Sequence, residues 1–239
     1  MIYALLVTIV RTFNLVTGHQ TIRYGERRLP RTGGAVVAIN HTSYVDFTYI
    51  GVNARLVDKR QLRFMGKIEL RKNPVLRWLM WGCGVIPVDR SAGHESYLAA
   101  VKELRAGEIV GIYPEATISR SFEIKDLKNG AARMALEADV PIIPAVVWGS
   151  QRIATKGLPR RLGRTRTPVL VTVGEPLAPT GSADELTAAL RTAMVALLVQ
   201  AQQAYGPHPA GENWVPASLG GSAPTPAEVE EQDRAVNEP

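Results

Sequence analysis

Cysteine, histidine and aromatic residues are scarce in this chain of 239 residues, and each scarcity excludes a class of protein. A single cysteine rules out a disulfide scaffold and a cysteine-based zinc site, and it fits a reducing compartment. Four scattered histidines leave little material for a multi-histidine centre, so we expect no metal. Aromatic side chains make up 6% of the residues, which is thin for a surface that stacks nucleic-acid bases.

The chain also lacks an apolar run long enough to cross a membrane. It starts with ten uncharged residues, MIYALLVTIV, whereas a spanning helix needs roughly 20 apolar residues. Nothing basic precedes this run, and Thr17-Gly18-His19 after it is a poor cleavage signal, so we do not expect a secretory signal. Residues 1–18 therefore form a helix that either packs on the domain or lies in the membrane interface. The motifs described below favour the interface.

Positive charge is in excess and unevenly distributed. The formal net charge is +6, and the last 19 residues hold five acids and one base, so the other 220 residues carry +10. This excess predicts an anionic partner, which could be nucleic acid, a phosphorylated substrate or a lipid surface. Residues 55–77 hold eight bases against two acids, and residues 151–166 hold six bases and no acid. Such runs attract an anionic bilayer by about 1 kcal/mol for each side chain, the alternative being an ordinary solvated face.

Short apolar runs alternate with helical patterns over residues 19–205, which predicts an α/β domain with a mixed, largely parallel central sheet flanked by helices. A capping box at Ser182 opens the last helix, and Ser43 is expected to cap the first helix after the first strand. Beyond Gly206 no apolar period survives, so residues 206–239 are expected to be a mostly disordered acidic tail in which Trp214 and Val215 could dock. The expected strands are 34–39, 62–70, 85–88, 108–113, 142–148 and 169–173, and the expected helices are 44–52, 74–81, 94–105, 130–138 and 183–205.

The sharpest local feature is Asn40-His-Thr-Ser-Tyr-Val-Asp46. His41 directly follows a predicted buried strand, and Asp46 lies five residues later in the next helical turn. In an open α/β sheet, ligands bind at the carboxyl ends of strands. A histidine held by a carboxylate keeps one ring nitrogen free as a general base. Such spacings are common, however, and a helix-capping His41 beside a solvated Asp46 is the alternative when this stretch is taken alone.

Three more blocks follow in order along the chain. Gly84-Val-Ile-Pro-Val-Asp-Arg90 ends a strand with an arginine that could bind a phosphate through two parallel hydrogen bonds. Tyr113-Pro-Glu-Ala-Thr-Ile-Ser-Arg-Ser121 ends another strand with a carboxylate and hydroxyls, and Val140-Pro-Ile-Ile-Pro144 leads into a further one. Together the four blocks resemble the motifs of the glycerolipid acyltransferase family that includes the 1-acylglycerol-3-phosphate acyltransferases. The ordered set is far more specific than any one block.

The resemblance implies a chemistry and a set of site residues. His41 would be the general base, and Asp46 would orient it, as the family's H-x-x-x-x-D signature. The reaction would move a fatty acyl group from an acyl-CoA or acyl carrier protein thioester, with no other cofactor, to the free hydroxyl of a 1-acylglycerol 3-phosphate, giving phosphatidate. Backbone amides at Thr42 and Ser43 could stabilise the oxyanion. The substrate-binding residues would be Lys67, Arg90, Glu115, Thr117, Ser119 and Arg120.

The third block departs from the family's P-E-G-T-R-S pattern at two positions. Ala116 replaces the glycine, which matters only if that position needs a positive φ. Ile118 replaces the arginine, which removes a phosphate donor. Arg120 could turn into the same site, or it could be an ordinary surface arginine. The acceptor could therefore also be glycerol 3-phosphate, another lysophospholipid or a glycolipid hydroxyl.

Two other classes compete with the acyltransferase interpretation. A basic nucleic-acid-binding protein would explain the charge, but it leaves the His41/Asp46 pair without a role and lacks stacking aromatics. A metal-dependent hydrolase is disfavoured because histidines are too few. We therefore expect a peripheral enzyme on the cytoplasmic face of the cell membrane that binds an anionic surface and no nucleic acid.

Overall fold

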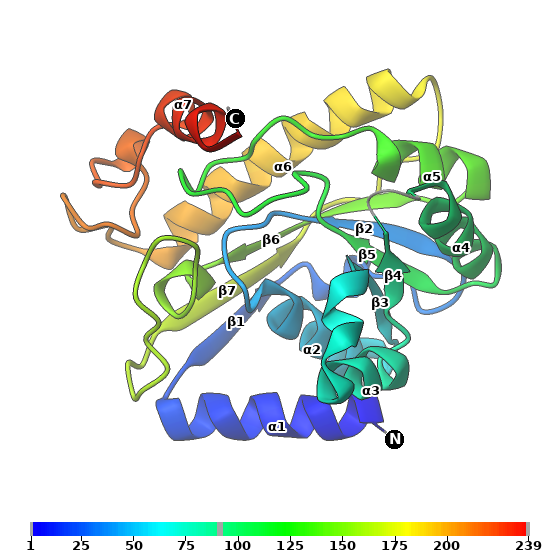
Figure 1. The fold of residues 1–239 in the computed structure, drawn as a ribbon, viewed down its shortest axis with the longest axis horizontal. Helices are drawn as coiled ribbons and strands as arrows, with labels where there is room; N and C mark the ends of the chain where they lie inside the picture. Colours follow the sequence, from blue (N-terminus) through cyan, green and yellow to red (C-terminus); the bar gives the residue numbers. More distant parts are fainter. Residues whose placement is uncertain (1, 90–92, 238–239) are drawn as a thin grey trace.

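The computed structural model describes residues 2–89 and 93–237, and a mixed seven-stranded sheet with helices on both faces forms its centre (Figure 1). The strand order is β1-β7-β6-β2-β5-β3-β4, and every neighbouring pair is parallel except β6 and β7. The predicted α/β fold with a mixed, largely parallel sheet is confirmed. The strands are β1 (Gln20–Tyr24), β2 (Ala35–Ile39), β3 (Leu62–Lys67), β4 (Ile86–Val88), β5 (Ile109–Ile112), β6 (Ile142–Trp148) and β7 (Pro168–Val173).

Two hydrophobic cores lie on opposite faces of this sheet, and β2 contributes to both because side chains alternate along a strand. Val36 and Ala38 belong to the core beneath α4 (Gly93–Arg105), α5 (Gly130–Ala138) and α6 (Ala183–Tyr205). The intervening residues of β2 pack against α2 (Asp46–Asp58). All five β2 residues are buried, which explains why β2 reads as a continuous apolar run.

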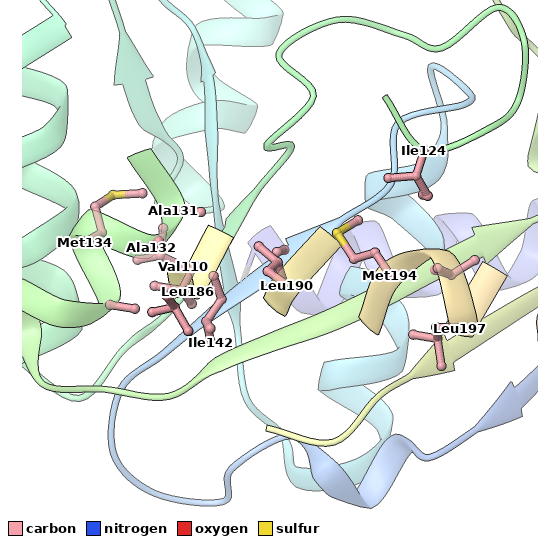
Figure 2. Packing of buried hydrophobic residues seen from close by; sticks show 14 of the residues in the cluster. Val110, Ile124, Ala131, Ala132, Met134, Ile142, Leu186, Leu190, Met194 and Leu197 are labelled. Atoms are coloured by element: carbon pink, nitrogen blue, oxygen red, sulfur yellow. The ribbon is translucent and has the colours of Figure 1, made fainter. Parts of the chain in front are cut away.

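Helix α6 supplies the longest contact with the first core. Figure 2 shows Leu186, Leu190, Met194 and Leu197 of α6 packed over the sheet near Ile142, with Ala131, Ala132 and Met134 of α5 beside them. Ser182 caps α6 through the predicted capping box, in which its hydroxyl accepts from the Glu185 amide and the Glu185 carboxylate accepts from the Ser182 amide. The box fixes the start of the helix that covers β6.

The N-terminal apolar segment forms α1 (Ile2–Thr17), which lies along the lower edge of the molecule in Figure 1 and packs on α2 and α3 (Pro74–Gly82). The Tyr3 hydroxyl donates to the carbonyl of Gly51 in α2 at 2.9 Å. The outward side of α1 leaves Leu5, Ile9 and Val16 exposed. Within the described residues, no helix is both long and apolar enough to cross a membrane.

The segment after α6 corrects the prediction of a mostly disordered tail. Trp214 and Val215 are buried, as the sequence allowed, and a short η4 (Ala217–Leu219) and α7 (Pro226–Asn237) follow them. Val229 of α7 is also buried. The prediction was wrong because a few isolated apolar side chains dock this segment, whereas the sequence criterion required a sustained apolar period.

Strand β1 and the end of β3 also differ from expectation. The sequence does not predict β1, because QTIRY is an edge strand that alternates between exposed and half-buried positions and pairs only with β7 among the described strands. Strand β3 ends at Lys67 rather than at residue 70, and the chain continues as the 3-10 helix η2 (Ile68–Lys72).

Candidate active site

The first motif begins at the carboxyl end of the central strand β2, and Asn40 fixes the backbone there. The Asn40 amide donates to the carbonyl of Val147 at 3.1 Å and accepts from the Val147 amide at 2.7 Å. The buried side-chain amide of Asn40 therefore extends the hydrogen-bond ladder between β2 and β6, where it takes the place of a backbone peptide group of β2. This link holds the next residue, His41, rigidly at the edge of the sheet.

Asp46 is fully buried at the first position of α2, and its two oxygens have different partners. Oδ2 accepts from the amides of Thr42 at 2.9 Å and Ser43 at 2.8 Å, and it lies 3.3 Å from Nδ1 of His41. Oδ1 accepts from the hydroxyl of Ser150 at 2.6 Å. These donors and the positive end of α2 offset the cost of burying the charge.

This geometry sets the tautomer of His41. Because the Asp46 carboxylate only accepts hydrogen bonds, Nδ1 of His41 is the donor, and Nε2 of the neutral ring is left as an acceptor. The side chain of His41 is 21% exposed, so a substrate hydroxyl can approach it. The 3.3 Å separation is long for such a bond, as is usual before substrates are in place.

Two local predictions about this turn are wrong. Ser43 does not cap α2, because the helix begins at Asp46 and the Ser43 hydroxyl donates instead to the carbonyl of Ala154 at 2.6 Å. The amides of Thr42 and Ser43 do not form an oxyanion hole, because both donate to Oδ2 of Asp46. The Asp46 side chain binds the backbone of the turn that precedes it, and the spacing of the residues in the sequence does not reveal this.

Tyr113, directly after β5, stacks on one face of the imidazole. Its ring stacks on His41 with centroids 4.0 Å apart and planes 20° apart, and Phe64 of β3 lies behind it at 6.4 Å. The two residues meet because β2 and β5 pair in parallel, with Ala38 opposite Ile112. The Tyr113 hydroxyl is buried, and burial raises the pKa of this phenol well above its ordinary value. Tyr113 was not predicted to be a site residue, although its position at the end of a predicted strand was the available signal.

The third block braces the backbone of His41 from both sides. Oε1 of Glu115 accepts from the His41 amide at 2.8 Å, Oε2 accepts from the Lys125 amide at 3.2 Å, and the carboxyl is 4% exposed. The Ser119 amide donates to the His41 carbonyl at 2.7 Å. Burial raises the pKa of Glu115 to about 7 against the lowering effect of its two hydrogen bonds. The structure thus gives Glu115 and Ser119 a positioning role, and their contact with substrate stays a prediction.

The other predicted substrate-binding residues are dispersed. Thr117 is exposed and accepts from the Lys125 ammonium at 2.8 Å. Lys67 is exposed at the end of β3, on the same edge of the sheet as His41. Arg120 turns away to α7, where it donates to Asp233 at 2.9 Å and Gln232 at 2.6 Å. Arg90, the predicted phosphate contact of the second block, lies outside the described residues.

Ala116, at the glycine position of the third block, adopts a left-handed backbone with φ of 61°. This position therefore does need a positive φ, and the methyl group of Ala116 costs conformational energy there. As for metals, among residues 2–89 and 93–237 no group of three or more His, Cys, Asp or Glu side chains could hold a metal ion.

Comparison with known proteins connects this geometry to a family. A family model described as Acyltransferase matches residues 21–148, more than half of the chain. The 1-acyl-sn-glycerol-3-phosphate acyltransferase of Bacillus subtilis is 35% identical over 127 residues, which cover 53% of this chain and 61% of that protein. The beta form of 1-acyl-sn-glycerol-3-phosphate acyltransferase of Homo sapiens is 30% identical over 147 residues, with coverages of 57% and 49%.

A solved structure shares the fold. The 1-acyl-sn-glycerophosphate acyltransferase PlsC from Thermotoga maritima superposes with a TM-score of 0.68 and 20% identity, over 87% of this chain and 81% of that chain. In sequence, by contrast, the matched region spans about half to three fifths of the curated relatives named above. The matches confirm the resemblance drawn from the four blocks.

Proposed function

The chain belongs to the acyltransferase family, and we propose from this premise that it moves a fatty acyl group from an acyl thioester to the free hydroxyl of a 1-acylglycerol 3-phosphate, forming phosphatidate. One observation carries the proposal: His41 sits partly exposed at the carboxyl end of β2 with Nδ1 directed to the buried Asp46. The names of the relatives support the choice of acceptor.

The reaction needs no protein nucleophile. Nε2 of His41 takes the proton of the acceptor hydroxyl as its oxygen attacks the thioester carbonyl. The new ester C–O bond forms, the C–S bond breaks, and the leaving thiolate takes the proton back from the imidazolium. The Asp46 carboxylate stabilises the imidazolium, while Tyr113 keeps the ring in its plane. Acyl-CoA or acyl carrier protein supplies the thioester as a co-substrate, and no other cofactor is required.

A second candidate keeps this chemistry and changes the acceptor. Ile118 stands where the family pattern has arginine, and the substitute cation, Arg120, is paired with Asp233 of α7. Both observations favour an acceptor whose phosphate is held elsewhere or is absent, such as another lysophospholipid or a glycolipid hydroxyl. Lys67 is the predicted phosphate contact that the structure leaves exposed at the correct edge of the sheet.

The same proposal includes peripheral attachment to the cytoplasmic face of the cell membrane. Leu5, Ile9, Phe13 and Val16 recur at intervals of four, four and three residues and form one exposed stripe on α1. The neighbouring α3 exposes Trp78 and Trp81. An exposed apolar helix face of this kind lies in the interface plane of a bilayer, and the nearby basic run adds attraction to anionic lipid.

The test is thiol release from palmitoyl-CoA by purified protein, with and without 1-acylglycerol 3-phosphate in detergent micelles. We expect acceptor-dependent release that falls about 10²- to 10⁴-fold in His41→Ala, the usual contribution of a positioned base. His94→Ala is the matched control, because His94 is exposed on α4, and it should keep full activity. Release that survives in a folded His41→Ala protein would refute the mechanism, and repeating the assay with other acceptors separates the two candidates.

A further inference from the structure

A cavity of about 460 Å³ lies between α1, β1 and α2, and none of the candidate active-site residues lines it. Its volume is typical of pockets that bind small ligands. We call it the α1–β1 pocket. It is lined by Thr8, Arg11, Thr12, Asn14, Leu15, His19, Thr21, Arg23, Tyr49 and Val52.

The charged side chains that line the α1–β1 pocket are all positive. It contains two guanidinium groups, several hydroxyls and an amide, but no carboxylate. Leu15 and Val52 are its only aliphatic members. A pocket with this composition offers hydrogen-bond donors and positive charge without an internal counter-ion, which suits an oxyanion with several acceptor atoms.

Two polar atoms of its lining also lack hydrogen-bond partners among the described residues, although Nε2 of the His19 ring is paired with the Thr165 hydroxyl. Nε of Arg23 and Nδ1 of His19 are buried and form no hydrogen bond in the part of the chain that the structure describes. Nε of Arg23 is a donor, and buried donors are nearly always paired, so an unpaired one at a cavity calls for an explanation. Burial lowers the pKa of Arg23, Glu26 raises it, and the positive charge of Arg11 lowers it further, although an arginine stays protonated. The effects of Glu26 and Arg11 on Arg23 oppose each other, so what a bound anion would satisfy here is the unpaired Nε of Arg23.

The position of the pocket on α1 points to the source of such an anion. At 100° for each residue, Arg11 and Thr8 lie on the flank of α1 between its packed side, at Val7, and the exposed stripe of Leu5 and Ile9. A lipid whose chains lie against that stripe would place its headgroup beside this flank.

We propose that the α1–β1 pocket is a phosphate-binding site, separate from the catalytic residues, with Arg11 and Arg23 as its ligands. The phosphate belongs either to the headgroup of an anionic phospholipid or to a soluble phosphate ester. The proposal goes beyond the acyltransferase activity and does not depend on it, so its test uses binding alone.

The lipid arm measures flotation with vesicles of phosphatidylcholine, with and without phosphatidylglycerol. Arg77→Gln is the control, because Arg77 is exposed on α3 and does not line the pocket. It should lose about fivefold of the binding that depends on phosphatidylglycerol, the generic contribution of one charge near an anionic bilayer. Arg11→Gln and Arg23→Gln should lose at least about tenfold more, because a charge-assisted hydrogen bond disappears as well.

The soluble arm titrates inorganic phosphate at constant ionic strength and follows the NMR signals of the β1 amides and the His19 ring. Saturable shifts that vanish in Arg11→Gln, with pocket variants no worse than Arg77→Gln in flotation, would assign the site to a soluble phosphate ester. Losses in the pocket variants that exceed the loss in Arg77→Gln by about tenfold in flotation would assign it to the headgroup. If the pocket variants match Arg77→Gln and phosphate produces no saturable shift, the proposal is wrong. Arg11 is exposed on α1, so its variant decides the test if Arg23→Gln fails to fold.

Discussion

Ala116 carries a conformation that its side chain disfavours, which makes Ala116→Gly a direct test of the geometry of the third block. Its φ of 61° lies in the left-handed region, and its amide closes a turn by donating to the Tyr113 carbonyl at 3.0 Å. A left-handed backbone costs an L-residue about 1–2 kcal/mol, and glycine avoids this cost. Glycine in turn adds about 0.4–1 kcal/mol of unfolded-state entropy that folding must overcome. We expect a net gain of about 0.5–1 kcal/mol in the free energy of unfolding.

The control for this substitution is Ala99→Gly, in which the same atoms are removed from an exposed position inside α4. There the backbone is helical, so glycine should lower the free energy of unfolding by about 1 kcal/mol. Urea titration followed by circular dichroism measures the free energy of unfolding of both variants. In a thermal melt, each 1 kcal/mol would correspond to about 2–4 °C in Tm for a chain of this size. If Ala116→Gly destabilises the protein as much as Ala99→Gly does, the left-handed turn and its role in the third block are refuted.

The remaining predictions concern the two buried carboxyls. Asp46→Asn should fold, because the amide can place its oxygen at the Oδ2 position and donate its N–H to the Ser150 hydroxyl. Its kcat should fall about 10- to 150-fold, which corresponds to the 1.5–3 kcal/mol of a hydrogen bond to a charged group. An unchanged kcat would mean that the reaction does not use the charge of Asp46. The pKa of Glu115 is about 7 in the folded state against 4.5 for the free side chain, so the folded state binds this proton more tightly than the unfolded state does. The contribution of Glu115 to the free energy of unfolding is therefore complete below pH 4.5, and about 3 kcal/mol of it is lost as the pH rises through 7. Urea titrations from pH 5 to 8 should show this fall in the wild type and its absence in Glu115→Gln, and a constant difference between the two proteins would contradict the assignment.

The sequence predicted the central elements well because their physics is local. Buried parallel strands give continuous apolar runs, so β6 and the other inner strands were found within a few residues. The capping box at Ser182 located the start of α6 to the residue. Strand β1 was missed because an edge strand has no such run. Helix α7 was missed because Val229 is the single buried apolar side chain among its residues 226–234, and the hydrogen bonds from Arg120 leave no sequence pattern.

The contacts of the site were less predictable than its residues. The spacing of His41 and Asp46 indicated the pair, but three further hydrogen bonds of Asp46 depend on Ser150, 104 residues away, and on the shape of one turn. Pattern reasoning therefore assigned the Thr42 and Ser43 amides to an oxyanion when the aspartate already holds them. Long-range contacts of this kind become visible only when the sheet brings the strand ends together.

The two departures of the third block from the family pattern fall at positions that leave His41 undisturbed. Its buried members, Glu115 and Ser119, bond the amide and the carbonyl of His41, and both residues keep the family identity. The replaced positions, Ala116 and Ile118, are exposed or half-exposed and take no part in that brace. Neither departure thus touches the contacts that hold His41, whereas Ile118 lacks the cation that the family pattern has at that position. This pattern is expected if the acyl-transfer chemistry is fixed while recognition of the acceptor is free to change.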